Sequence, residues 1–113
     1  MMTRGEAMSK TAYDFKAAVL KALAHPNRLR ILEALRCDRE ICNCEIGPKL
    51  GLEQSNLSRH LLALAEAGLV VARKEGVRMM YEVTDPRVFK VLDLVGEMIK
   101  KQFVERAELL EIL

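Results

Sequence analysis

The strongest constraint on the fold is a pair of helical segments joined by a turn of only a few residues. The first segment ends near Leu50 and Gly51, where a glycine suits the left-handed turn that closes many helices. The second is predicted from Gln54 to Ala67, because its leucines recur every three or four residues and Gly68 follows. Two helices joined by so short a turn containing a glycine are typical of a helix-turn-helix unit.

The rest of the sequence predicts two earlier helices, a β-hairpin and a long final helix around that unit. Apolar residues recur at helical spacing from Thr11 to Ala24, and again from Pro26 to Cys37. Two β-prone runs, 69–74 and 78–83, flank a short glycine-containing connection, which indicates a hairpin. Pro86 opens the final helix. We therefore expect a mainly α fold with a small β-hairpin, in the winged helix-turn-helix arrangement.

The length of the chain bounds its organisation. Its 113 residues predict one domain over residues 1–113, with residues 1–9 flexible. A final helix of roughly 25 residues extends about 37 Å, which is longer than the body it packs on. Its apolar stripe from Val88 to Leu110 should therefore be partly buried against a second copy of the chain.

Charge and hydropathy exclude some classes of protein but identify no partner. Eighteen Lys and Arg against sixteen Asp and Glu give a net charge of +2, which is too small to indicate a binding partner. No window approaches the roughly 20 apolar residues that a membrane span requires, and the chain does not start like a signal peptide. We expect a cytoplasmic protein without a membrane partner.

The cysteines favour a metal or redox site over an enzyme. Cys42 and Cys44 are too close in sequence for a framework disulfide, and in a reducing cytosol such thiols are more often metal ligands or redox groups. Both should lie at or before the start of the next helix, because Pro48 is harmless only in a first turn. The two histidines, His25 and His60, belong to no Ser-His-Asp arrangement, and we expect His60 to be a hydrogen-bonded core residue.

Two longer stretches carry a specific resemblance. One is Ala22-Leu23-Ala24-His25-Pro26-Asn27-Arg28-Leu29-Arg30-Ile31-Leu32. The other is Leu50-Gly51-Leu52-Glu53-Gln54-Ser55-Asn56-Leu57-Ser58-Arg59-His60-Leu61, followed by Leu64, Gly68-Leu69-Val70, Arg73, Gly76 and Tyr81. In order and spacing they resemble the ArsR/SmtB family of metal-responsive repressors, over roughly residues 15–100. The resemblance implies a homodimer, paired through its first and last helices, that binds operator DNA and releases it when a metal or metalloid binds.

Two groups of side chains suit double-stranded DNA. The start of the second helix of the unit offers polar side chains that can bond base edges or phosphates in a major groove: Gln54, Ser55, Asn56, Ser58 and Arg59. The hairpin adds three cations for the adjacent phosphates: Arg73, Lys74 and Arg78. Any of them can instead be an ordinary solvated residue. We call the second helix of the unit, from Gln54 to Ala67, the reading helix. A dimer that places its two reading helices one turn of the DNA apart should bind an inverted-repeat operator. Glu53 departs from the Ser or Thr that the family commonly places there, and is a poorer cap.

The ligand prediction depends on Ile41-Cys42-Asn43-Cys44-Glu45-Ile46, which resembles the family's thiolate motif Leu-Cys-Val-Cys-Asp-Leu. In the arsenic-sensing branch a third cysteine follows three positions after the second, and here that position is Gly47. We therefore predict Cys37, Cys42 and Cys44 as thiolate ligands of arsenite, antimonite or another soft metal ion, with no constitutive cofactor. Cys37 has an alternative reading as a small, half-buried residue that closes the second helix.

The sequence leaves alternatives to an arsenic sensor. A cadmium- and lead-sensing branch also carries the paired cysteines, but its extra N-terminal cysteines are missing from residues 1–36. A zinc site on the last helix is disfavoured, since Asp93 and Glu97 are present but no histidine follows residue 60. A redox switch would join Cys37 to Cys42 or Cys44 by a disulfide.

The spacing of the paired cysteines suggests how a signal would be passed on. Residues i and i+2 of an α-helix point about 200° apart, so two helical cysteines cannot clasp one ion. Ion binding should then hold open or unwind the helix start, and the reading helix packed on that helix would tilt.

Overall fold

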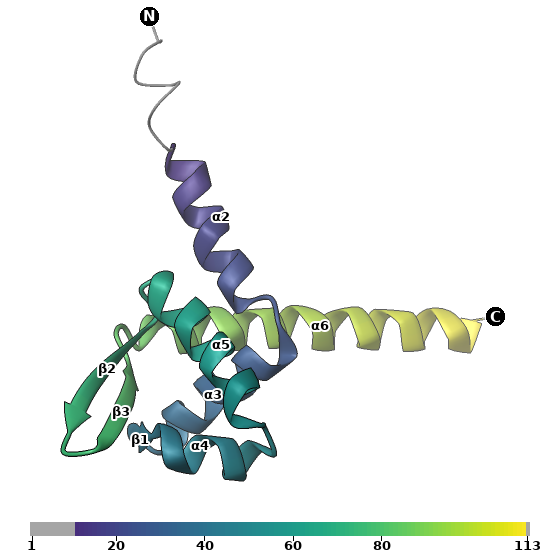
Figure 1. Ribbon diagram of the computed structural model, residues 1–113. Coiled ribbons are helices and arrows are strands. Elements are labelled where there is room, and N and C mark those ends of the chain that lie inside the picture. Colours follow the sequence, from purple (N-terminus) through teal and green to yellow (C-terminus); the bar gives the residue numbers. More distant parts are fainter. Residues whose placement is uncertain (1–10, 113) are drawn as a thin grey trace, which may run out of the picture.

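The computed structural model describes residues 11–112 and has the predicted winged helix-turn-helix architecture (Figure 1). In chain order its elements are α2 (Ala12–Leu23), α3 (Pro26–Cys37), β1 (Glu40–Cys42), α4 (Asn43–Leu50), α5 (Gln54–Glu66), β2 (Val70–Glu75), β3 (Arg78–Val83) and α6 (Arg87–Ile112). The expectation of flexibility for residues 1–9 lies outside the described residues, and a single domain over the whole chain stays a prediction. No described helix is both long and apolar enough to cross a membrane.

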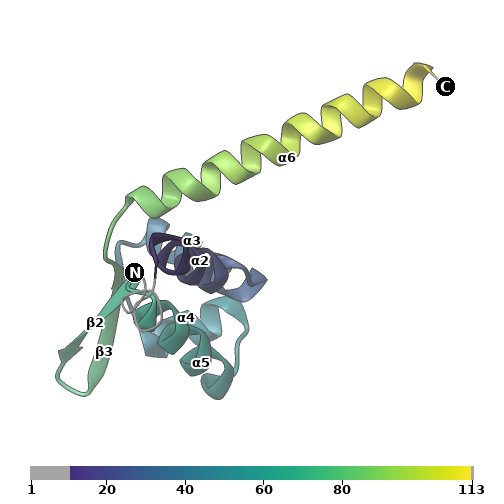
Figure 2. The same cartoon turned by 90° about the horizontal axis from the view of Figure 1, so that it is seen from above.

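One hydrophobic core lies where α3, α4 and α5 meet the base of the sheet. Leucine and isoleucine dominate it, since the apolar stripe of each amphipathic helix faces inward. Its fully buried large side chains are Ile31, Leu32, Ile46, Leu57 and Leu64. The core fixes α4 and α5 against each other, while α6 extends beyond the body of the molecule (Figure 2).

The wing is part of a three-stranded antiparallel sheet with the strand order β1-β3-β2. Strands β2 and β3 form the expected hairpin, and Gly76 at its tip has a φ of 65°, which suits glycine. Strand β1 was not predicted, because three residues are too few to show an alternating pattern. It pairs with β3, with Cys42 opposite Met80, and so attaches the cysteine segment directly to the wing.

Helix α4 begins earlier than Pro48 led us to expect. Cys42 is its N-cap residue with an extended backbone, while Cys44 lies in the first helical turn and Pro48 lies inside the helix. The expectation that both cysteines lie at or before the helix start is therefore wrong for Cys44. Gly47 contributes to this, because it lacks the Cβ atom that is one source of the clash between a proline ring and the residue before it.

Gly47 also sets how closely the two helices of the unit approach each other. Its carbonyl oxygen accepts a hydrogen bond from the backbone N–H of Leu52 at 2.9 Å. A Cβ atom at position 47 would lie 3.1 Å from the carbonyl oxygen of Leu52 and 3.5 Å from a methyl carbon of Leu57. Gly51 ends the helix with a φ of 69°. The turn between α4 and α5 is thus held by close backbone contacts.

His60 is a buried, hydrogen-bonded histidine, as the sequence led us to expect. Its Nδ1 accepts a hydrogen bond from Arg28 Nε at 3.2 Å, and its ring lies 4.3 Å from that of His25. His25 in turn caps α3, its Nδ1 accepting from the Asn27 N–H at 3.0 Å. Burial, followed by the positive charges of His25, Arg28 and Arg59, lowers the pKa of His60. The neutral ring therefore seats α5 against α3.

This histidine predicts a loss of stability in acid. Because the pKa of His60 is lower in the folded chain, the unfolded chain binds more protons as the pH falls below about 6.5, and stability then decreases. His60→Gln keeps a hydrogen-bond acceptor but does not titrate. Urea unfolding at pH 7.5 and pH 5, at one protein concentration, should show a smaller acid loss for this variant. One proton contributes at most about 1.4 kcal/mol per pH unit. Equal losses in both proteins would contradict this role.

Candidate functional site

The first turns of α5 present the predicted DNA-reading side chains to solvent. Gln54, Ser55, Ser58 and Arg59 are exposed and Asn56 is partly exposed. Arg59 Nη2 donates to Asn56 Oδ1. The opposite face of the helix is anchored in the core by buried leucines. This polar face is therefore held by a rigid element and is accessible along its whole N-terminal half.

The start of α5 lacks a side-chain cap. Glu53 stands at the N-cap position, but its carboxylate makes no capping hydrogen bond, and no acidic residue occupies the first turn. The weak cap expected from the sequence is confirmed. The first backbone N–H groups of a helix are suited to bind an anion such as a phosphate.

The three predicted wing cations are exposed on β2 and β3. Arg73 pairs with Glu40 at 2.6 Å and with Glu75 at 2.9 Å, and hydrogen bonding to these carboxylates raises its pKa. Arg78 Nη2 lies 3.3 Å from Glu45 Oε1. Lys74 makes no ion pair within residues 11–112.

Two of these carboxylates, Glu40 and Glu45, flank the cysteine pair, and neither was expected to take part in the site. Each meets an arginine 33 residues later in the chain, so no local pattern could reveal the contact. The contacts place Arg73 and Arg78 beside the cysteine segment.

Cys42 and Cys44 meet at the junction of β1 and α4. Cys42 is fully buried, Cys44 is exposed, and the structure joins their sulfur atoms in a disulfide. The Cys44 N–H lies 3.1 Å from the Cys42 sulfur. Our expectation that these cysteines do not pair is therefore wrong. The hypothesis that ion binding holds open or unwinds the helix start stays a prediction, and the extended backbone of Cys42 already turns its side chain toward Cys44.

Glu45 is the third potential ligand that the structure brings to this pair. Its carboxylate oxygen and the two sulfur atoms all lie within 4.8 Å of one another. Cys37 is not brought to this group. It is exposed at the end of α3, in a hollow with Lys49 and Leu50 of the last turn of α4. The paired cysteines lie at the opposite end of α4, where Cys42 is the N-cap residue and Cys44 lies in the first turn. The set of three cysteines stays a prediction.

Asp93 of α6, one of the acidic residues considered for a zinc site, makes an ion pair that stabilises the packing of α6 on α3. Both carboxylate oxygens of Asp93 accept hydrogen bonds from Arg36, at 2.8 and 2.6 Å, and this guanidinium lowers the pKa of Asp93. The Arg36 guanidinium also lies 5.1 Å from the ring centroid of Phe89. These contacts fasten α6 to α3.

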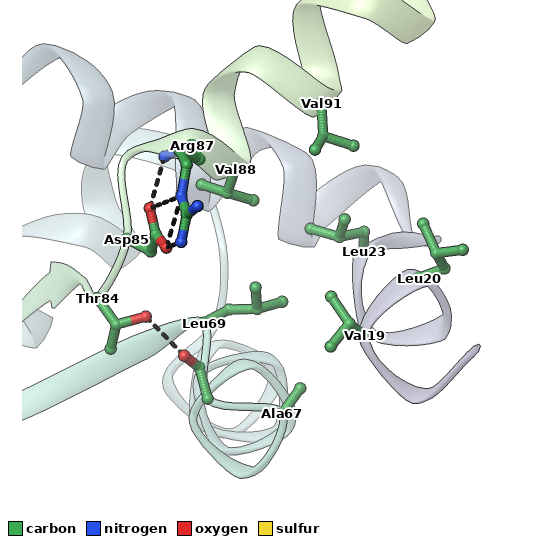
Figure 3. A pocket seen from close by; sticks show the side chains of 11 residues that line it. Val19, Leu20, Leu23, Ala67, Leu69, Thr84, Asp85, Arg87, Val88 and Val91 are labelled. Carbon is green, nitrogen blue, oxygen red and sulfur yellow. Dashed lines mark hydrogen bonds and ion pairs between the residues drawn. The ribbon is translucent and has the colours of Figure 1, made fainter. Parts of the chain in front are cut away.

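Helices α2 and α6 leave a large apolar surface uncovered. Within α6 only Val88 is buried among the residues that the structure describes. Between the two helices lies an apolar hollow in which Val19, Leu20 and Leu23 face Val88 and Val91 (Figure 3). Further exposed apolar side chains are Tyr13, Phe15, Leu94, Val95, Met98, Ile99, Phe103 and Val104. A surface of this extent indicates a protein interface.

Known proteins share both the sequence and this architecture. Residues 25–71 match the model of the bacterial regulatory protein family arsR. The HTH-type transcriptional regulator Rv0081 of Mycobacterium tuberculosis is 38% identical over 104 residues, which cover 91% of this chain and 90% of that protein. The chain belongs to the ArsR family. The resemblance seen in the sequence is confirmed, and this ArsR-family chain is a DNA-binding transcriptional regulator rather than an enzyme.

Solved structures agree with the assignment to the ArsR family. The crystal structure of Rv0081 has a TM-score of 0.75 at 37% identity, covering 88% of this chain and 99% of that one. The homodimeric winged helix-turn-helix domain of Mb0332 from Mycobacterium bovis has a TM-score of 0.71 at 33% identity, covering 89% of both chains.

One sequence relative is named for its inducer. An arsenical resistance operon repressor of Staphylococcus xylosus is 36% identical over 72 residues, which are 64% of this chain and 68% of that protein.

Proposed function

We propose that this ArsR-family regulator is a homodimeric repressor that releases an inverted-repeat operator when arsenite or antimonite binds Cys42 and Cys44. The observation that carries the proposal is the convergence of the two sulfur atoms where β1 meets α4. Thiolates prefer soft ions, and the arsenical repressor of Staphylococcus xylosus is a relative. Its cytoplasmic location stays a prediction.

The chemistry of the pair fits such an ion once the sulfurs are reduced to thiolates. The Cys44 N–H already points at the Cys42 sulfur, and this contact becomes a charge-assisted hydrogen bond when that sulfur is ionised. Cys44 is exposed, so an ion can reach the pair from solvent. The proposal also includes Cys37 as a third thiolate. This residue lies beside the last turn of α4, so it would have to move toward the cysteine pair to bind the same ion.

The position of the pair connects it to both DNA-binding elements. Strand β1 ends at Cys42 and pairs with β3 of the wing, while α4 begins at Asn43 and contacts α5 through Gly47 and the turn. A change at the cysteines therefore acts on two elements at once. In this proposal the reading helix contacts bases through Gln54, Ser55, Asn56, Ser58 and Arg59, and the wing contacts phosphates through Arg73, Lys74 and Arg78.

The test is operator binding by the reduced protein, measured by fluorescence anisotropy on DNA from its own upstream region. Arsenite, antimonite, cadmium, lead and zinc are compared, with peroxide as a separate arm. Arsenite and antimonite should weaken binding by roughly 5–150-fold, the usual range for coupled sites. Operator binding that arsenite and antimonite leave unchanged would overturn the proposal.

A second candidate function, a thiol redox switch, is favoured by the disulfide between Cys42 and Cys44. The redox switch expected from the sequence joined Cys37 to Cys42 or Cys44 instead. A peroxide would oxidise the two thiols to the disulfide and be reduced to water, with both thiol protons transferred to oxygen. Release of DNA by peroxide, without release by arsenite, would establish this function in place of the first.

A further inference from the structure

We propose that Arg28 is a positioning residue for DNA recognition, which holds the reading helix α5 at a fixed angle to α2, a helix of the proposed dimer interface. The proposal rests on the homodimer proposed above and names a residue that sets the distance between its two reading helices. Arg28 bonds the buried side of α5, away from the polar face that presents the reading side chains. Its part is therefore to position that face and not to contact DNA.

The first argument is that α2 has few contacts with the body of the molecule. Among the described residues of this helix only Ala22 and Leu23, in its last turn, are buried. The rest of α2 extends away from the body (Figure 1). The direction of α2 therefore depends strongly on each contact that its last turn makes.

The second argument is that Arg28 bonds a carbonyl group that α2 cannot satisfy by itself. The Ala22 carbonyl would normally accept from the backbone N–H of residue 26, but residue 26 is a proline and has none. Arg28 Nη1 donates to this oxygen at 3.3 Å. A cation is also favoured at this end of a helix, where the backbone dipoles leave a partial negative charge. The guanidinium thus fastens the end of α2.

The third argument is that the same guanidinium also holds α5. Arg28 Nε donates to Nδ1 of His60 at 3.2 Å, and the His60 side chain is buried. A guanidinium is planar and its N–H groups have fixed directions, so two bonds from one group fix the angle between their two partners. In a dimer with twofold symmetry, a rotation of α5 against α2 occurs in both protomers. Such a rotation therefore changes the separation of the reading helices.

The first test measures that separation in the full-length protein without DNA. All three cysteines are replaced by serine, and Leu62→Cys adds one spin-label site at an exposed position of α5. Pulsed electron resonance then gives the distance between the two labels of a dimer. Arg28→Gln should shift the mean distance by about 2 Å or broaden the distribution, because glutamine cannot make both bonds. Arg39→Gln, which removes an exposed arginine after α3, is the matched control and should change neither.

Conservative variants of the histidine separate positioning from a general loss of structure. His60→Gln keeps an acceptor for Arg28, whereas His60→Leu removes it. The distance distribution of His60→Gln should therefore stay closer to that of the protein with His60 intact. Circular dichroism checks that every variant remains helical. Equal distributions in His60→Gln and His60→Leu would overturn the bond to Arg28 as the cause.

Operator DNA provides the second test, with one base pair inserted or removed between the half-sites. The unmodified protein should bind the natural spacing several-fold more tightly than either altered spacing. Arg28→Gln should bring this ratio close to one. A ratio that Arg28→Gln leaves unchanged, or an unchanged distance distribution, would overturn the proposal. Failure of the homodimer itself is distinguishable, because the labelled protein with Arg28 intact would then give no distance between labels.

Discussion

Val95→Glu together with Ile99→Glu will convert the protein to a monomer and abolish operator binding. Both side chains are about half exposed on α6, at 48% and 44%, within the apolar surface that α2 and α6 leave uncovered. Burying two unpaired carboxylates in such an interface costs several kcal/mol each. Operator affinity should fall by on the order of 100-fold or more, because a monomer engages only one half-site.

Light scattering at micromolar concentration measures the assembly, and circular dichroism checks that the helices remain. Lys90→Glu is the matched control. It also adds negative charge to α6, but helix geometry places it on the opposite side of that helix from Val95. This control should remain a dimer. An unmodified protein that is a well-folded monomer, or a doubly substituted protein that still dimerises, would contradict the interface.

Cys42→Ser and Cys44→Ser will each bind the operator normally and fail to release it with arsenite. Serine keeps the size of the side chain, but it is neutral at pH 7 and a poor ligand for a soft ion. The response should fall from roughly 5–150-fold weakening of DNA binding to none. Anisotropy titrations with and without arsenite measure both quantities on the same protein.

Cys37→Ser separates two ligand sets for arsenite. Loss of the response would make Cys37 the third thiolate, which would require it to move from the far end of α4. A retained response at weaker affinity would leave a site of two thiolates completed by solvent. Normal release by either Cys42→Ser or Cys44→Ser would contradict the site itself.

Much of the fold could be predicted because helical periodicity is visible in sequence. The bounds of α3 and α5 agree with prediction to within a residue, since proline or glycine flanks each amphipathic stripe. Helix α4 was placed too late because part of the effect of Pro48 depends on a Cβ atom in the preceding residue. Gly47 has none, so the exception was available in the sequence and went unused.

The candidate site was only half visible from the sequence. The close spacing of Cys42 and Cys44 indicated a thiol site, and family resemblance added the expected chemistry. Strand β1 depends on pairing with β3, about 40 residues later in the chain, and the contacts of Glu40 and Glu45 with the wing each span 33 residues. The sequence does show a glutamate on each side of the cysteine pair. Their role becomes apparent only in the fold, which places an arginine opposite each of them.

The glycine at position 47 also restricts how this regulator can evolve. The arsenic-sensing branch has a cysteine there, and a single base change converts many glycine codons to cysteine codons. In this chain, however, the new Cβ atom would press on the Leu52 carbonyl oxygen, and the turn would have to give by a few tenths of an ångström. A three-cysteine helix in this chain would therefore also require an adjustment of the turn that orients α5. A lineage carrying this turn has a readier route to a third ligand through residues outside the α4–α5 contact.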